Sequence, residues 1–336
     1  MTNPIANLLR MADIATPYAI RVAATLRLPQ LIAEGSTRID ELAARAQANP
    51  DALGRLLRLL VLREVFTESE PGTFGLTEIG RLLVDEDPLH LRAGFDLDGF
   101  GQADLAFSGL LKSVRTGEPA YQDVYGKPFW EDLATDQELS ASFDALMERH
   151  RAITNPVVLD GYEWETVDHL VDVGGGRGSL LTMLLSAHSG MRGTLVELPA
   201  TAAFAKRRIA EAGLSQRCSV VAGSFFDELP AGASVYLLSF VLHDWSDQDA
   251  VRILGRCADA ISTDGRILLI ERTNIDATRS EDFVGMDLRM LVYFGGRERT
   301  VGEFGELVAK AGLIIRRTLR CPSYFSILEC VNDDQL

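Results

Sequence analysis

His243 stands where an apolar run ends, in the segment SFVLHDWSD that covers residues 239–247. The pKa of a histidine is ordinarily about 6.5, so this side chain could take a proton from a substrate hydroxyl near neutral pH. The same residue could instead be a packing or capping group at the start of the next helix. For a lone histidine at a strand end that second interpretation is the better one, so the choice depends on its neighbours.

A glycine-rich loop follows a predicted buried strand in DHLVDVGGGRG, residues 168–178. A dinucleotide-binding fingerprint that starts at Gly174 needs glycine at its sixth position, where this chain has Ser179. The spacing from Asp172 through Gly174 and Gly176 instead resembles the loop that binds S-adenosylmethionine (SAM) in class I methyltransferases. By itself, such a loop could also be a tight turn without a ligand.

Two later segments favour a ligand at this loop. Glu197 ends the next predicted strand, and an acidic residue at that place can accept hydrogen bonds from ribose hydroxyls. The third strand runs into GSFFDELP, in which Phe225 could stack on an adenine and Ser224 could bind its edge. Core packing is an equally good interpretation of Phe225 taken alone.

The second half of the chain, residues 166–336, alternates predicted strands and helices. This order predicts βαβ units and a parallel, Rossmann-like sheet, so the fold class is α/β. The segments IIRRTLRC and SYFSILEC predict a final hairpin. Because parallel strands end at one edge of the sheet, we expect Glu271 and His243 to lie beside the glycine loop.

Residues 1–165 are predicted to be mostly helical. Within them the order is helix, turn, helix, a short hairpin around Pro71 and Gly72, and another helix. That order is typical of a winged helix. We expect the helical stretch from Glu138 to Asp160 to link the two domains.

Charge and composition exclude several classes of partner. The formal net charge of the 336 residues is −15, which opposes binding to nucleic acid or to an anionic membrane. We find no signal peptide and no apolar run of about 18 residues that would predict a transmembrane helix. The four cysteines form no CxxC pair, so we expect reduced thiols and a cytoplasmic protein.

Five motifs together resemble the SAM-dependent small-molecule O-methyltransferases, which include plant phenolic enzymes and bacterial antibiotic-pathway relatives. They are VDVGGGRG, GSFFDELP, LSFVLHDWSD, LLIERT and GGRERT. The resemblance covers essentially the whole chain. It implies SAM as the cofactor, a class I methyltransferase domain, and a winged-helix-like dimerisation domain. It also implies a homodimer in which the partner helps to close each active site.

The resemblance carries roles to particular residues. It implies that His243 is the general base and that Glu271 and Glu298 flank it. The plant enzymes have a lysine that touches the cofactor where this chain has Ser239, which is similar to the bacterial form. Trp245 either lines the cofactor pocket or packs beneath it. Ser224 replaces a plant acidic residue, which weakens the expected adenine contact.

The segments FWEDL, SFFD, MDLRML and YFGGRERT are similar to bacterial enzymes that methylate polyketide-derived aromatics, particularly hydroxynaphthoic acids. In this family the helix containing FVGMDLRMLVYF lines the acceptor pocket, so Met286, Met290 and Phe294 are candidates for substrate contact, with core packing as the alternative. Arg10 could pair with an aromatic carboxylate or could be a solvated surface residue.

The chemistry that this implies is simple. A phenol, with a pKa of about 10, becomes a good nucleophile once a histidine takes its proton. No cluster with metal-ligand spacing is present in the sequence, so we expect metal-independent catalysis. One alternative is a SAM-binding homologue with divergent chemistry, a hydroxylase or decarboxylase. Another is a winged-helix, ligand-sensing regulator, which the acidic charge opposes because DNA recognition needs a basic surface.

Overall fold

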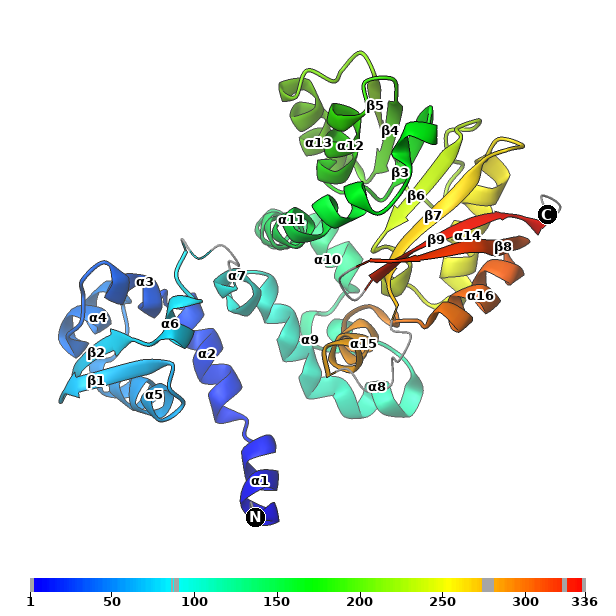
Figure 1. Ribbon diagram of the computed structural model, residues 1–336. Helices are drawn as coiled ribbons and strands as arrows, with labels where there is room; N and C mark the ends of the chain where they lie inside the picture. Colours follow the sequence, from blue (N-terminus) through cyan, green and yellow to red (C-terminus); the bar gives the residue numbers. More distant parts are fainter. Residues whose placement is uncertain (1–2, 86, 88–90, 274–280, 322–324, 334–336) are drawn as a thin grey trace. The chain divides into compact units, whose positions relative to one another are not determined.

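The structure is a computed structural model that describes residues 3–85, 87, 91–273, 281–321 and 325–333. The chain divides into two compact units (Figure 1). The helical unit comprises Met1–Asp104 and Glu138–Arg149, and the sheet unit comprises Leu105–Gln137 and His150–Leu336.

The helical unit contains the predicted helix, turn, helix and hairpin. Asn49 starts the second of these helices because its side chain accepts a hydrogen bond from the Ala52 amide, and Pro50 fits the first turn. Gly72, with φ of 79°, makes the turn between the two strands. The elements are α1 (Pro4–Met11), α2 (Ala15–Thr25), α3 (Leu28–Ala33), α4 (Ile39–Arg45), α5 (Pro50–Leu62), β1 (Phe66–Glu70), β2 (Thr73–Leu76), α6 (Glu78–Arg81) and α7 (Arg92–Phe95).

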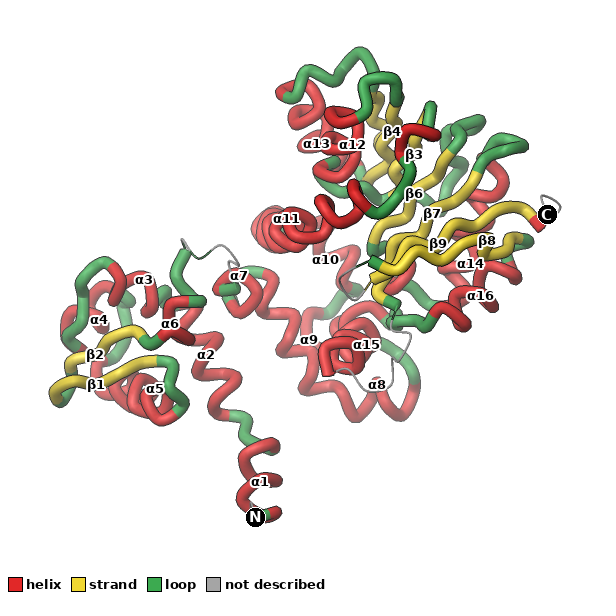
Figure 2. The backbone as a smooth tube through the Cα atoms, in the orientation of Figure 1, coloured by secondary structure: helices red, strands yellow, loops and turns green. Residues whose placement is uncertain are grey.

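The sheet unit is built on seven strands in the order β5-β4-β3-β6-β7-β9-β8 (Figures 1 and 2). The first five are parallel, and β9 pairs antiparallel with both β7 and β8, which confirms the predicted final hairpin. The strands are β3 (His169–Val173), β4 (Arg192–Glu197), β5 (Cys218–Ala222), β6 (Val235–Ser239), β7 (Arg266–Arg272), β8 (Leu313–Arg320) and β9 (Phe325–Asn332).

Helices cover both faces of this sheet, as the near-continuous apolar strands predict. The helices after residue 160 are α12 (Ser179–Ala187), α13 (Pro199–Glu211), α14 (Asp247–Ala260), α15 (Glu281–Phe294) and α16 (Val301–Lys310). Before them come the 3-10 helix η1 (Phe100–Gly109), α8 (Leu110–Thr116), α9 (Tyr121–Tyr125), α10 (Phe129–Thr135) and α11 (Gln137–Asp160). Two further 3-10 turns are η2 (Trp164–Thr166) and η3 (Leu242–Asp244).

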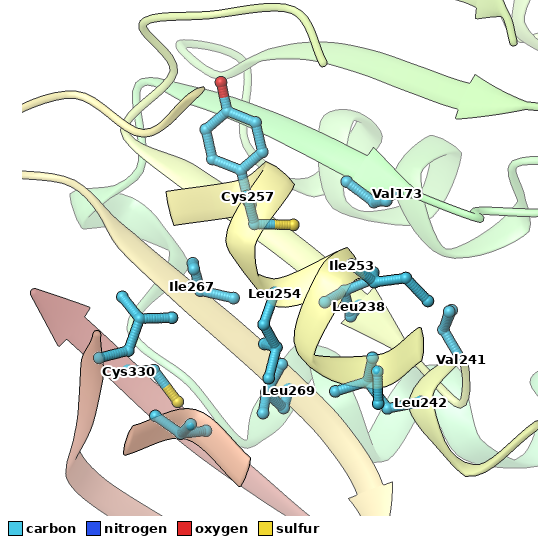
Figure 3. Packing of buried hydrophobic residues seen from close by; sticks show 14 of the residues in the cluster. Val173, Leu238, Val241, Leu242, Ile253, Leu254, Cys257, Ile267, Leu269 and Cys330 are labelled. Atoms are coloured by element: carbon cyan, nitrogen blue, oxygen red, sulfur yellow. The ribbon is translucent and has the colours of Figure 1, made fainter. Parts of the chain in front are cut away.

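The core consists of one apolar layer on each face of the sheet. Alternate side chains of one strand enter different layers: Leu238 packs with α14 and α16, whereas Leu237 packs with α12 and α13. Figure 3 shows the first layer, where Leu254 of α14 lies near Ile267 and Leu269 of β7. Because both layers are fully buried, the sheet gives the loops at its carboxyl edge a rigid base.

The compact units differ from the predicted division at residue 165. Helices α8, α9 and α10 contact α15, so residues 105–137 belong to the sheet unit. The division also falls inside α11, between Arg149 and His150, so this helix contributes to both units. Compact units and domains need not coincide, and the boundary between residues 1–165 and 166–336 stays a prediction.

No helix within the described ranges is long and apolar enough to span a membrane.

Candidate active site

The carboxyl ends of three neighbouring strands meet at one edge of the sheet. Strand β6 lies between β3 and β7, so the segments that follow β3 and β6 are adjacent to Glu271 near the end of β7. A Cβ atom built on Gly174 would lie 3.1 Å from Cγ2 of Val241, which shows how closely the glycine loop approaches the segment before His243. The predicted co-location of His243, Glu271 and the loop is therefore confirmed.

His243 lies in η3 with its side chain only 13% exposed. Its Nδ1 is 3.0 Å from Oε1 of Glu298, and its Nε2 is 3.4 Å from Oδ1 of Asp244. Both ring nitrogens thus face carboxylates. Sequence reasoning gave Asp244 no role in the site and missed its contact with the ring.

The two glutamates that were expected to flank His243 occupy different places. Only Glu298 is within hydrogen-bond distance of the ring. Oε1 of Glu271 instead accepts from the amides of Val241 (3.1 Å) and Leu242 (2.7 Å), so this carboxylate holds the turn that carries His243. Oε2 of each glutamate is buried and has no hydrogen-bond partner among the described residues.

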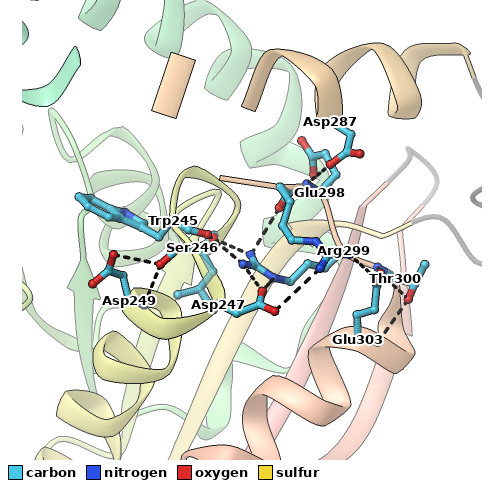
Figure 4. Close-up of polar contacts among 11 residues, drawn as sticks. Trp245, Ser246, Asp247, Asp249, Asp287, Glu298, Arg299, Thr300 and Glu303 are labelled. Carbon is cyan, nitrogen blue, oxygen red and sulfur yellow. Dashed lines mark hydrogen bonds and ion pairs between the residues drawn. The ribbon is translucent and has the colours of Figure 1, made fainter. Parts of the chain in front are cut away.

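A second segment clamps the loop after β6. Arg299 is 1% exposed, and its guanidinium donates to the carbonyls of Leu242 and Trp245 at 2.8 Å each and to Asp247 at 2.7 Å (Figure 4). Gly296 packs directly on the carbonyl of His243, where a Cβ would clash. Sequence reasoning missed both residues, although the glycines and the arginine of GGRERT were a visible signal.

Asp287 on α15 orients the other side of this segment. Its Oδ1 accepts from the backbone amide of Glu298 at 2.9 Å, so it acts on the glutamate that contacts the ring (Figure 4). The amide of Arg297 donates to the carbonyl of His243 at 2.9 Å. Together these bonds fix Glu298 against the histidine.

The carboxylates dominate the electrostatics of the site. Burial disfavours the protonated form of His243, but the charges of Asp244, Glu298 and Glu271 outweigh burial and raise the pKa of the histidine to about 10. Burial raises the pKa of Glu271 to about 7 and that of Asp244 to about 6. The site therefore favours a positive charge.

The glycine loop has its own buried carboxyl group. Asp172 is 1% exposed beneath Gly175, and its Oδ2 has no partner among the described residues. Burial raises the pKa of Asp172 to about 7. Arg151 of α11 donates to the Gly175 carbonyl at 2.6 Å and lies against Gly176, a contact that sequence reasoning missed.

Glu197 closes the other side of the loop. Its Oε2 accepts from the Gly176 amide at 2.9 Å, and its Oε1 accepts from the Leu198 amide at 2.7 Å. Carboxylate oxygens can accept further bonds, so Glu197 can still receive ligand hydroxyls. Phe225 lies beside Gly174 and remains half-buried.

The remaining predicted cofactor residues lie near this loop or at the ends of its strands. Ser224 uses its Oγ to accept from the Phe226 amide at 3.2 Å, and Ser239 is the last residue of β6. Trp245 packs edge-on against Phe225, with ring centroids 5.7 Å apart. It also packs edge-on against Phe226 at 4.9 Å, and it stacks on Trp130 of α10 at 5.9 Å and 13°. Sequence reasoning quoted FWEDL but did not single out Trp130.

The predicted acceptor residues are partly brought together. Phe294 stacks on Trp130 at 5.2 Å and 23°, Met290 is 5% exposed, and Met286 is half-buried. Arg10 is exposed in α1 of the helical unit and bonds to Asn7 at 3.0 Å. Its contact with a substrate stays a prediction.

These groups fit SAM. The unpartnered Asp172 oxygen suits a cationic or hydrogen-bond-donating group, the Glu197 carboxylate suits hydroxyls, and the Phe225 ring suits a flat base. The carboxylates around His243 suit a cationic sulfur. No group of three or more potential metal ligands occurs within the described ranges, and metal independence stays a prediction.

Comparison with known families and proteins agrees with this geometry. An O-methyltransferase domain matches residues 107–314, and an O-methyltransferase dimerisation domain matches residues 9–86. The chain is 49% identical to the 2,7-dihydroxy-5-methyl-1-naphthoate 7-O-methyltransferase of Streptomyces carzinostaticus, over 95% of each chain. It is also 44% identical to the aclacinomycin 10-hydroxylase of Streptomyces purpurascens, over 95% of this chain and 88% of that one.

A solved structure is similar throughout. It is an O-methyltransferase from neocarzinostatin biosynthesis, crystallised with SAM and 2-hydroxy-5-methyl naphthoic acid. The TM-score is 0.91 at 48% identity, and the match covers 96% of this chain and 98% of that chain. The resemblance seen in the sequence motifs is confirmed for fold and enzyme class, and it favours an enzyme over a regulator. The chain belongs to the O-methyltransferase family.

Proposed function

We propose that this protein transfers a methyl group from SAM to a phenolic hydroxyl of a polyketide-derived, hydroxynaphthoate-like aromatic in antibiotic biosynthesis. The observation that carries the proposal is the His243–Glu298 pair, which lies at the same sheet edge as the glycine loop. The naphthoate O-methyltransferase at 49% identity and the structure crystallised with SAM and a naphthoic acid support the substrate class.

His243 is the general base of this proposal. With Nδ1–H donating to Glu298, the neutral ring presents the lone pair of Nε2 to the acceptor hydroxyl and removes its proton. Glu298 then stabilises the imidazolium that forms. SAM, when bound, supplies a methyl group on a positively charged sulfur. Glu271 is a positioning residue, because it binds the backbone of the turn before His243.

The cofactor residues of the proposal surround the glycine loop. Asp172, Gly174, Gly176, Glu197, Ser224, Phe225, Ser239 and Trp245 are the predicted set. To these the geometry adds Arg151, whose guanidinium lies against Gly176 and already binds the loop carbonyl. A guanidinium here suits the carboxylate of the amino-acid part of SAM.

The acceptor is proposed to bind at α15 and the aromatic residues beside it. Phe294 and Trp130 offer a flat stack, and Met286 and Met290 can adapt to a ring. Arg10 is proposed to pair with the acceptor carboxylate.

We propose that the protein is a homodimer and that it is located in the cytoplasm. The match to a dimerisation domain supports a dimer. Helix α1 also exposes apolar side chains that a partner could cover: Ile5, Leu8, Leu9 and Met11 are each 66–71% exposed. All four cysteines are free thiols, as is usual in a reducing compartment.

A second candidate is hydroxylation of a related aromatic polyketide. It is favoured by the 44% identity to aclacinomycin 10-hydroxylase, which shows that this scaffold also occurs in a protein with a different activity. The two candidates make different products, a methyl ether or a new hydroxyl group, so product analysis separates them.

The test is methyl-label transfer from SAM to a panel of hydroxynaphthoates, anthraquinones and simple phenols, with and without a chelator. We expect chelator-insensitive labelling of hydroxynaphthoates and a loss of about 10²–10⁴-fold in kcat for His243→Ala. His188→Ala, at the end of α12, is the matched histidine control. Unlabelled hydroxylated products, or equal rates for His243→Ala and wild type, would overturn the methyl-transfer mechanism.

A further inference from the structure

The surroundings of His243 fit a doubly protonated ring. Nδ1 faces Glu298 at 3.0 Å and Nε2 faces Asp244 at 3.4 Å. A neutral imidazole has one N–H and one lone pair, so one of these carboxylates would then face a lone pair. Only the imidazolium carries a positive charge that both the hydrogen bond to Glu298 and the ion pair with Asp244 can stabilise.

Two further acidic groups, Glu271 and Asp287, bind the backbone of the segments that carry His243 and Glu298. Glu271 is fully buried and binds the two amides that precede His243. Asp287 approaches from α15 through the amide of Glu298. These groups and Asp244 give the pocket a surplus of negative charge.

The basic groups near the ring do not cancel this surplus. Arg299 directs its guanidinium at Asp247 and at two backbone carbonyls. Arg297 pairs with Glu303, away from the ring. His150 of α11 lies beyond Phe240 and 3.4 Å from Arg272, and its burial lowers its pKa to about 4, so it is neutral at neutral pH.

This arrangement conflicts with the proposed reaction. A general base must be neutral to accept the phenol proton, whereas the carboxylates raise the pKa of His243 to about 10. The ring must therefore lose a proton before it can act. The same carboxylates that hold that proton can also hold another positive charge.

We infer that His243 gives up its Nε2 proton when the sulfonium charge of the cofactor enters the site, so that cofactor binding makes the base competent. The inference rests on the proposed use of SAM and His243. Gly174 of the cofactor loop lies against Val241, whose amide donates to Glu271, so the loop adjoins one of the carboxylates that raise the pKa of His243. Positive charge nearby disfavours the imidazolium.

The proton balance of the step is complete. The Nε2–H bond breaks, its electron pair stays on the nitrogen, and the proton passes to solvent. Nδ1 keeps its proton because Glu298 is the nearer carboxylate. The site gains one positive charge and loses one, and Nε2 is left with the lone pair that the acceptor hydroxyl needs.

Calorimetry of cofactor binding tests the inference without any methyl transfer. SAM and S-adenosylhomocysteine are titrated into the protein at about pH 8 in phosphate and in Tris, whose ionisation enthalpies differ widely. The dependence of the observed enthalpy on the buffer gives the protons released. We expect more than about half a proton for SAM and less than about 0.2 for S-adenosylhomocysteine, which lacks the sulfonium charge.

Three variants assign the proton. His243→Gln should abolish the difference between the two ligands, and it also subtracts any titration of the ligands' own amino groups. His150→Gln and the remote His188→Gln should keep the difference. Loss of the difference in His150→Gln, or equal proton release by both ligands in wild type, would overturn the inference.

The affinity for SAM gives an independent readout. By linkage, the affinity for SAM should increase up to about tenfold for each unit that the pH rises, within the range between the pKa values of His243 in the bound and in the free protein. The affinity for S-adenosylhomocysteine should be almost the same at each pH. Parallel pH profiles for the two ligands would contradict the inference. Proton release on SAM binding without labelling of any aromatic would support the inference and refute the proposed substrate. Labelling of an aromatic without proton release would support the proposed substrate and refute the inference.

Discussion

Strand β7 has a buried, charged cluster near each of its ends, and the two clusters differ in how completely their glutamates are paired. Near the amino end, both oxygens of Glu329 have partners: Tyr162 on Oε2 and Arg316 on Oε1, at 2.8 Å from its Nε. Arg266 donates to the Tyr162 hydroxyl at 2.6 Å. At the carboxyl end, Glu271 and Glu298 each leave one buried oxygen without a partner among the described residues.

The pKa values follow this difference. The hydrogen bonds from Tyr162 and Arg316 outweigh burial and lower the pKa of Glu329, whereas burial raises the pKa of Glu271 to about 7. A fully paired carboxylate stabilises the fold, while an incompletely paired one is ready to interact with a cation. The same strand thus supports structure at one end and chemistry at the other.

The largest expected effect comes from a variant that disrupts the cluster around Glu329 at the amino end of β7. Glu329→Ala should lower the free energy of unfolding by about 3 kcal/mol, because it leaves buried groups of Tyr162 and Arg266 without their partner. Urea denaturation measures this, and kcat at saturating substrate should stay near the wild-type value. Glu271→Gln is the comparison: its amide oxygen can still accept from the turn, so stability should change by less than about 1 kcal/mol. A larger loss in Glu271→Gln than in Glu329→Ala would reverse the contrast.

The next effect concerns catalysis. Glu298→Gln should lower kcat by about 10–100-fold, because an amide stabilises the imidazolium less than a carboxylate does. Stability should remain close to wild type, and Glu303→Gln, on the neighbouring helix α16, serves as the control for charge removal. The kcat/KM pH profile should move toward lower pH, since His243 loses a charge that raises its pKa. An unchanged profile would show that Glu298 does not act through the histidine.

Removing one hydroxyl sharpens the structural side. Tyr162→Phe should destabilise the fold by about 1.5 kcal/mol, since the hydroxyl joins Glu329 to Arg266. Thermal unfolding measures the change in stability, and kcat should stay at the wild-type value. Tyr18→Phe in α2, where the side chain is 41% exposed, should change stability by less than about 0.5 kcal/mol. Equal effects of the two variants would mean that the cluster contributes little.

The smallest effect, about 1 kcal/mol, is an opposite pH dependence at the two ends. The lowered pKa of Glu329 gives stability above its ordinary pKa of 4.5 that is lost as the pH falls through the folded value. The raised pKa of Glu271 has the reverse sign: its contribution falls as the pH rises from 4.5 to about 7. The free energy of unfolding of Glu329→Gln should therefore approach that of wild type in acid. The free energy of unfolding of Glu271→Gln should rise relative to that of wild type as the pH approaches neutrality. Unfolding curves at about pH 3 and pH 5 test the Glu329 trend, and curves at about pH 5 and pH 7 test the Glu271 trend.

Much of the fold could be predicted because it depends on local patterns. The apolar runs before Gly174, Glu197 and Ser239 predicted strands, and the parallel order then placed His243 near Glu271. The division of the chain into compact units was not predictable in this way. The packing of α8–α10 on α15 joins segments that are more than 140 residues apart, and no periodicity encodes it.

The site was predicted as a set of residue types and only partly as geometry. A sequence places two glutamates near a histidine, but it does not say which one reaches the ring and which one binds the backbone. That choice depends on the path of the chain after β6, which the contacts of Arg299 and Gly296 fix. Arg151 was missed because it comes from a helix that precedes the sheet.

The distance along β7 has a practical consequence for engineering. Arg266 and Glu271 are five positions apart along the strand, which is about 17 Å of extended chain. Changes at such a distance are usually additive. The thermal stability of the enzyme could therefore be increased at the amino end of the strand, for instance by replacing exposed groups around Arg316. Its acceptor specificity could be evolved separately at the carboxyl end.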